Sequence, residues 1–110
     1  YLIFPLDKLE SHAGLLRLWL TVLMATILRR REKPATRTLM LIDECAQLGK
    51  FQLLKPLITL CRGFGLQAWL FFQSLAQLKA EYSEDWRTIL DNVAVVQAFG
   101  FDNVFAAQEW

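Results

Sequence analysis

The chain has 110 residues, a mass of 12.7 kDa and a hydrophobic fraction of 55%, which suffices for one domain with a core and makes one domain the ceiling for these residues. Twelve Lys and Arg against eleven Asp and Glu give a net charge of +1, so bulk electrostatic attraction to nucleic acid or to an acidic membrane is excluded. The two cysteines, Cys45 and Cys61, lie far from the single His12, which argues against a zinc site and favours free thiols in a reducing compartment.

The first predicted elements are a short strand and a long helix. Tyr1–Phe4 is typical of a buried strand that Pro5 stops, and a helix is expected from about Gly14 to Arg31. The apolar positions with helical spacing are Leu15, Leu16, Trp19, Leu23 and Ile27. The uncharged run Leu18–Leu28 has eleven residues, whereas a membrane span needs roughly 20, so it predicts a buried amphipathic helix.

A second strand carries the main motif. The apolar run Thr38–Ile42 follows the linker 34–37 and predicts a central parallel strand that ends in Asp43 and Glu44. After it we expect a loop at Gln47–Gln52 and a helix at Leu53–Arg62, in which Pro56 is tolerable only in the first turn.

The remaining elements continue the alternation of strands and helices. They are a strand at Leu66–Phe72, a helical segment from Gln73 and Ser74 to Lys79, a short helix capped by Ser83 and reaching Leu90, a strand at Val93–Phe99 and the start of a helix at Phe101–Trp110. The predicted fold class is therefore α/β, with a largely parallel sheet and flanking helices.

Polar residues at the ends of two strands are the candidates for chemistry, because ligands of parallel sheets bind at the carboxyl ends of strands. Asp43 can hold Mg²⁺ through its water shell, and Glu44 can orient and deprotonate the water that attacks the γ-phosphate of ATP. If the two strands are neighbours, the Gln73 amide can sense that phosphate by hydrogen bonding. A solvated strand end for the acids and a loop or capping role for the glutamine are the alternatives.

Arg62 is a further candidate, placed between an apolar helix and Gly63–Gly65. On the residue alone, an ordinary partner of the helix C-terminal dipole is the favoured interpretation.

Several motifs in the same order resemble the coupling-protein ATPases of type IV secretion and conjugation, the TraG or VirD4 family. The resemblance rests on Leu41–Lys50, Arg62–Gly65, Phe72–Leu78, Tyr82, Trp86 and Ile89–Asn92, and extends to Leu15–Leu18. It implies a RecA-like P-loop ATPase using ATP and Mg²⁺. In it Asp43 and Glu44 form the second nucleotide motif, Gln73 senses the γ-phosphate and Arg62 reaches the nucleotide of a neighbouring subunit.

The resemblance also implies partners and a location. Family members assemble as homo-hexamers at the cytoplasmic face of the bacterial inner membrane, anchored by N-terminal helices absent from this chain. They bring DNA, relaxase or effector proteins to the secretion channel. No Gly-Lys-Ser or Gly-Lys-Thr loop occurs in the 110 residues, so 1–110 is expected to be the second half of the nucleotide-binding domain and to be inactive in isolation.

Two other interpretations remain. A receiver-type signalling domain, with Asp43 phosphorylated, needs further acids after its first strand, where only Asp7 and Glu10 occur. A non-catalytic α/β interaction module would keep the fold without the phosphate loop.

Overall fold

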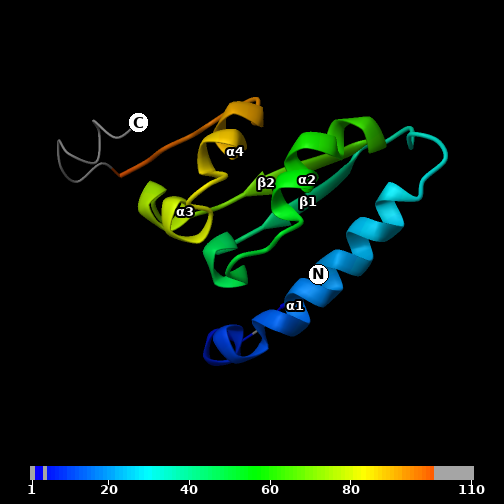
Figure 1. The fold of residues 1–110 in the computed structure, drawn as a ribbon. Coiled ribbons are helices and arrows are strands. Elements are labelled where there is room, and N and C mark those ends of the chain that lie inside the picture. Colours follow the sequence, from blue (N-terminus) through cyan, green and yellow to red (C-terminus); the bar gives the residue numbers. More distant parts are fainter. Residues whose placement is uncertain (1, 4, 101–110) are drawn as a thin grey trace.

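The computed structural model describes residues 2–3 and 5–100. Its elements are α1 (Leu6–Leu28), β1 (Thr38–Ile42), the 3-10 helix η1 (Cys45–Leu48), α2 (Leu54–Leu60), the 3-10 helix η2 (Cys61–Phe64), β2 (Leu66–Leu70), α3 (Leu75–Glu81) and α4 (Trp86–Asn92). The two strands pair in parallel, with Thr38 opposite Leu66 and Ile42 opposite Leu70. This arrangement of helices packed against parallel strands confirms the predicted α/β fold class (Figure 1).

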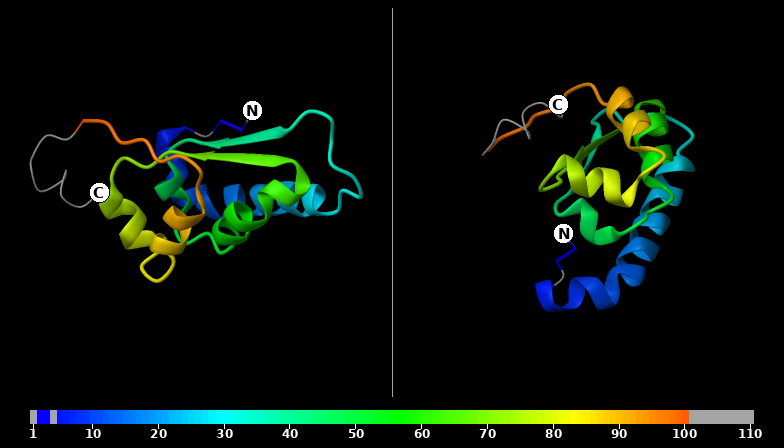
Figure 2. Two further views of the ribbon diagram at one scale, coloured as in Figure 1. Left: turned by 90° about the horizontal axis from the view of Figure 1, so that it is seen from above. Right: turned by 60° about the vertical axis from the view of Figure 1, so that its left-hand side comes forward.

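Among the described residues, helices cover one face of the sheet. Figure 2 shows α1, α2, α3 and α4 on the same side of the two strands. Side chains alternate between the two faces of a strand, so Ile42 and Leu66 are buried while Leu39, Leu41 and Trp69 are about half exposed. Among the described residues, the predicted central strand β1 is therefore buried on one face and about half exposed on the other.

The core lies between the sheet and the helices. Its buried members are Leu20, Met24, Ile27, Ile42, Cys45, Leu48, Phe51, Leu54, Leu57, Ile58, Leu66, Leu75, Leu78, Tyr82 and Ile89. Cys45 is fully buried and Cys61 is half-buried, and both are free thiols. Burial raises the pKa of Cys45 to about 12, because the thiolate would lose its hydration.

The helix α1 is longer than predicted and faces the core with a partly different set of side chains. It begins at Leu6, directly after Pro5, because the residues from there to the predicted start at Gly14 are mostly good helix formers. Of the five predicted positions, Ile27 is buried and Leu16 packs against the core, whereas Leu15, Trp19 and Leu23 are exposed. Leu20 and Met24, which were not predicted, are buried instead. Both stripes are apolar, so the periodicity alone could not show which one meets the core.

The length of α1 also bears on the prediction that its apolar stretch is too short to span a membrane. By length and composition, Ser11–Leu28 could cross a membrane, so the prediction that the apolar stretch is too short does not hold for the whole helix. However, Arg17 within this window donates a hydrogen bond to the Leu48 carbonyl, and Leu20 and Met24 pack in the core. These contacts tie α1 to the domain.

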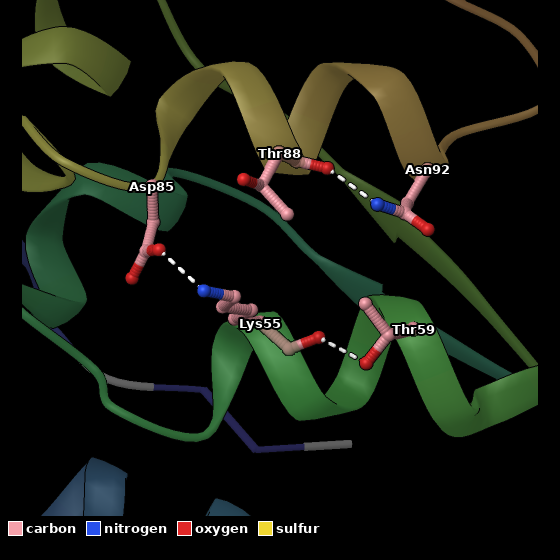
Figure 3. A network of polar contacts seen from close by, with 5 residues as sticks. All are labelled: Lys55, Thr59, Asp85, Thr88 and Asn92. Carbon is pink, nitrogen blue, oxygen red and sulfur yellow. Dashed lines mark hydrogen bonds and ion pairs between the residues drawn. The ribbon is translucent and has the colours of Figure 1, made fainter.

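The helices α2 and α4 differ from prediction at their ends. Pro56 lies in the first turn of α2, as required, but the helix ends at Leu60 and the chain tightens into η2. The predicted Ser83 cap is wrong, because Asp85 occupies the position before α4 after a turn in which its N–H bonds the Tyr82 carbonyl. Figure 3 shows Asp85 joined to Lys55 of α2 by an ion pair of 2.6 Å.

The predicted third strand, Val93–Phe99, is not formed. This segment is extended, but it forms no ladder with β2 and faces it across a broad hollow. Its apolar residues, including Val95 and Phe99, are largely exposed. A strand requires hydrogen bonds to a neighbouring strand, and no described segment lies beside it to supply them.

The two predictions at the chain ends lie mostly outside the described residues. Leu2 and Ile3 form no strand, and Tyr1 and Phe4 are not described. The helix expected at Phe101–Trp110 also falls outside the described residues.

Candidate functional site at the carboxyl ends of β1 and β2

Backbone hydrogen bonds hold together the two segments that leave the sheet. The Phe71 N–H bonds the Ile42 carbonyl at 3.0 Å, and the Cys45 N–H bonds the Phe71 carbonyl at 2.9 Å. The pairing of β1 and β2 thus continues past both strands. Glu44 and Gln73, which follow the ends of the two strands, therefore lie close together although 29 positions separate them in the sequence.

Glu44 has an unusual backbone conformation. Its φ of 50° and ψ of 48° are left-handed, and it is the one non-glycine residue with positive φ in the part of the chain that the structure describes. Such a conformation costs free energy in a residue with a Cβ atom and is enriched at functional sites. The Glu44 N–H donates to Oδ1 of Asp43 at 3.1 Å, so the two acids share one tight turn.

The Gln73 side chain contacts the carboxylate of Glu44 directly. Its Nε2 atom lies 3.0 Å from Oε1 and 2.8 Å from Oε2 of Glu44. Hydrogen bonds to an ionised acceptor are stronger than those between neutral groups, so the amide restrains this carboxylate. The structure therefore brings together two of the predicted site residues.

Gln77 is a member of the site that the sequence analysis did not assign. Its Oε1 accepts the Gln73 N–H at 2.9 Å, and its Nε2 donates to Oε1 of Gln73 at 3.2 Å. Ser74 caps α3 by accepting the Gln77 N–H at 3.2 Å. The spacing of four residues between the glutamines is the signal that could have identified this pair.

A second set of contacts anchors the far end of η1. Arg17 donates to the Leu48 carbonyl, and the Tyr82 hydroxyl donates to the Gly49 carbonyl at 3.1 Å and accepts the Phe51 N–H at 3.3 Å. Burial raises the pKa of Tyr82 to about 12, so its hydroxyl keeps its proton at neutral pH and can donate. The 3-10 helix after Glu44 is thus fixed by α1 and by the residue that follows α3.

Asp43 has the chemistry expected of a magnesium partner. It is exposed, and Oδ2 has no hydrogen bond within the described residues. No group of three or more His, Cys, Asp or Glu side chains that could hold a metal is present in residues 2–3 and 5–100. Mg²⁺ needs few protein ligands, because it keeps several waters and takes oxygens from substrate phosphates. One free carboxylate oxygen therefore fits a water-mediated contact.

Arg62 is not part of this cluster. It lies in η2, before β2 begins, whereas Glu44 and Gln73 follow the strands. The strands are parallel, so Arg62 is at the opposite end of the sheet, and five residues at about 3.3 Å each separate the two ends by roughly 17 Å. Arg62 therefore cannot reach the site of its own chain.

Comparisons with known proteins identify the family of this chain. A family model described as Type IV secretory system Conjugative DNA transfer matches residues 1–108. The conjugal transfer proteins TraG of Agrobacterium fabrum (strain C58 / ATCC 33970) and Rhizobium radiobacter are each 34% identical over 82 residues, which is 74% of this chain. The chain spans only 12% and 13% of the lengths of these two relatives.

Two solved structures share the fold. The plasmid coupling protein TrwB in complex with the non-hydrolysable GTP analogue GDPNP has a TM-score of 0.72 and 29% identity, covering 81% of this chain and 22% of TrwB. TrwB with the ATP analogue ADPNP has a TM-score of 0.70 and 30% identity, and the match covers 78% of this chain and 21% of TrwB. Because the family model matches nearly the whole length of this chain, the chain belongs to the TraG-type coupling proteins of the type IV secretory system conjugative DNA transfer family.

Proposed function

We propose that this chain is part of the ATPase motor of a coupling protein that recruits and moves DNA or protein substrates, and that it supplies the water-activating half of the nucleotide site. The observation that carries the proposal is the contact of the Gln73 amide with the Glu44 carboxylate at the carboxyl ends of two parallel strands. This end of a parallel sheet is where such folds bind ligands. The nucleotide analogues in the two TrwB complexes support the choice of ligand.

In the proposed reaction, Glu44 accepts a proton from the water molecule that attacks the γ-phosphorus of ATP. The new bond from water oxygen to phosphorus forms as the bond to the ADP oxygen breaks, which gives ADP and phosphate. Asp43 would hold Mg²⁺ through its water ligands, and the bound ion would neutralise charge on the phosphates.

Gln73 has a double role in this proposal. In the described structure its amide donates to Glu44, so the carboxylate is held in one orientation. A γ-phosphate oxygen can compete with the Glu44 carboxylate for the two N–H donors of this amide. An amide that reports on the phosphate while touching the base can transmit the nucleotide state to α3 through Gln77.

The remaining parts of the site come from outside this chain. The 110 residues contain no Gly-Lys-Ser or Gly-Lys-Thr loop, so we propose that another segment of the full-length protein cradles the phosphates. We further propose a homo-hexamer at the cytoplasmic face of the inner membrane that delivers DNA, relaxase or effector proteins to the secretion channel. In a ring, Arg62 of one subunit would serve the nucleotide of the next.

The test is Glu44→Gln in the full-length protein, with Asp85→Asn as the matched control because Asp85 lies in a surface ion pair away from the site. Loss of the base should lower ATP turnover by about two orders of magnitude or more and abolish conjugative transfer while ATP binding persists. The control should retain both activities. Near wild-type turnover by the Glu44→Gln protein would show that the Asp-Glu assignment is wrong.

A further inference from the structure

Two exposed arginines lie at the end of the sheet opposite to Glu44. Arg37 directly precedes β1, and Arg62 lies in η2 just before β2. The Thr38 N–H bonds the Gly65 carbonyl at 2.9 Å, so the two segments that enter the sheet lie side by side. Both arginines line the same hollow beside β2. Arg37 and Arg62 therefore form a pair, which we call the entry arginines.

The entry arginines have no partners within the described residues. Both side chains are exposed, and neither donates a hydrogen bond or forms an ion pair in that part of the chain. Arg30, which is nearby in sequence, differs, because it donates to the Phe64 carbonyl at 3.4 Å and to the Thr38 hydroxyl at 2.9 Å. Arg30 thus has a structural role, whereas the donors of the entry arginines remain available.

The backbone around this pair is held in place. Arg30 links the segment before β1 to η2 through its two hydrogen bonds. Pro34 packs against Gly65, whose φ is 67°, so closely that a Cβ atom there would lie 2.8 Å from the proline ring. The relative placement of Arg37 and Arg62 is therefore set by packed elements and does not depend on a loose loop.

The two ends of the sheet are complementary in charge. Arg37 and Arg62 lie at the amino end, and the carboxylates of Asp43 and Glu44 lie at the carboxyl end. Because the ends are roughly 17 Å apart in one copy, the two groups can meet only between copies. Opposed, complementary ends suit a head-to-tail contact, which closes into a ring when the rotation permits.

We propose that Arg37 acts together with Arg62, so that each copy presents two guanidinium groups to the phosphate oxygens of a nucleotide held at the Glu44 end of the next copy. This inference rests on the proposed function, and it adds Arg37 to the site. A planar guanidinium binds phosphate oxygens in a bidentate manner, and two of them can contact two phosphoryl groups. Lysine is a poor replacement for such a contact.

The experiment uses the full-length protein with Arg37→Ala, Arg37→Lys and the control Arg31→Ala. Arg31 is exposed in the same segment but does not line the hollow. The first readout is assembly promoted by a non-hydrolysable ATP analogue, measured by analytical ultracentrifugation. The second is kcat and KM for ATP. Both Arg37 variants should lose most of the nucleotide-promoted assembly and at least about tenfold in kcat, whereas Arg31→Ala should match the wild type.

A mixture of subunits tests the direction of the contact. Arg37→Ala subunits mixed with Glu44→Gln subunits should regain part of the activity, because some interfaces then pair an intact Arg37 with an intact Glu44. Circular dichroism shows whether each variant is folded, and we expect the wild-type secondary structure. This measurement separates loss of the Arg37 contact from loss of folding. Should Arg37→Ala misfold, Arg37→Lys supplies the same readouts with the stem of the side chain retained.

Three results would overturn the inference. The first is assembly and turnover of Arg37→Ala equal to those of Arg31→Ala. The second is unchanged assembly with weakened binding of a fluorescent single-stranded oligonucleotide, which would assign Arg37 to the phosphates of DNA. The third is an equal loss of assembly with and without the analogue, which would assign Arg37 to a protein contact. Full turnover by Glu44→Gln would instead refute the proposed function, whereas the role of Arg37 is decided separately by whether Arg37→Ala loses nucleotide-promoted assembly relative to Arg31→Ala.

Discussion

Nε2 of Gln73 lies 2.8 Å and 3.0 Å from the two carboxylate oxygens of Glu44, so one amide nitrogen contacts both oxygens of the proposed base. The glutamine is itself held by Gln77, in the first turn of α3. The Gln73 side chain therefore links α3 to the Glu44 carboxylate.

Replacement of Gln73 by Ala in the full-length protein should leave nucleotide affinity within about threefold of wild type while abolishing substrate transfer. An amide senses a phosphate but cannot replace a charge or a base, so its loss should uncouple the nucleotide state from movement. Calorimetry with an ATP analogue and a mating assay measure the two effects. Gln52→Ala is the matched control, because Gln52 is exposed in the loop before α2. Unfolding of the Gln73→Ala protein would show that this residue has a structural role.

Arg62→Ala and Glu44→Gln subunits should complement each other. Each variant alone should be inactive, since the arginine finger contributes roughly 10³ to 10⁵ in rate in known NTPases and the base is equally required. Arg62 lies at the opposite end of the sheet from Glu44, so mixed rings should recover turnover at interfaces with both residues intact. ATPase assays across mixing ratios measure the recovery. Normal ATP hydrolysis by the Arg62→Ala protein alone would contradict the arginine-finger assignment. Arg62 would then be only a partner of the helix C-terminal dipole.

Tyr82→Phe should loosen the loop after η1. The substitution leaves the Gly49 carbonyl and the Phe51 N–H without their partner, and an unpaired buried polar group costs about 1–3 kcal/mol. Hydrogen exchange of residues 49–53 in the full-length protein should become faster, with α4 unchanged as the internal reference. Unaltered exchange at 49–53 would mean that Arg17 alone is sufficient to hold this loop.

Cys45 should resist alkylation at a pH where Cys61 reacts. Burial raises the pKa of Cys45 from 9.0 to about 12, and only the thiolate is nucleophilic, so Cys45 should remain unlabelled in the folded protein at pH 8–9. Peptide mass spectrometry after iodoacetamide treatment measures both sites, and denaturant should make them equally reactive. Rapid native labelling of Cys45 would contradict its burial.

The raised pKa of Cys45 also predicts that the folded protein loses stability at alkaline pH. The folded-state pKa of Cys45 lies above its ordinary value, so the contribution to the free energy of unfolding is complete below pH 9 and declines as the pH rises towards 12. Cys45→Ala should remove this part of the pH dependence, although it also removes buried volume. Thermal melting of both proteins across pH 8–11 gives the comparison.

Local patterns in the sequence determined several features of this protein. The run Thr38–Ile42 is long enough only for a strand and is one in the structure, with Asp43 and Glu44 at its end. Motif order indicated the family, which the match to residues 1–108 confirms. The position of Pro56 in the first turn of α2 follows from proline chemistry alone. These features depend on neighbours in the chain, so they can be predicted from it.

Tertiary structure decided the features that depend on contacts across the chain. The pairing of β1 with β2 brings Gln73 to Glu44 and removes Arg62 to the other end of the sheet. The apolar segment Val93–Phe99 has the composition of a strand but is not one, because strand formation requires hydrogen bonds from a neighbouring backbone. Likewise, α1 has two apolar stripes, and only packing in the core selects the one that carries Leu20 and Met24. Burial is a property of the assembled fold, and composition alone does not determine it.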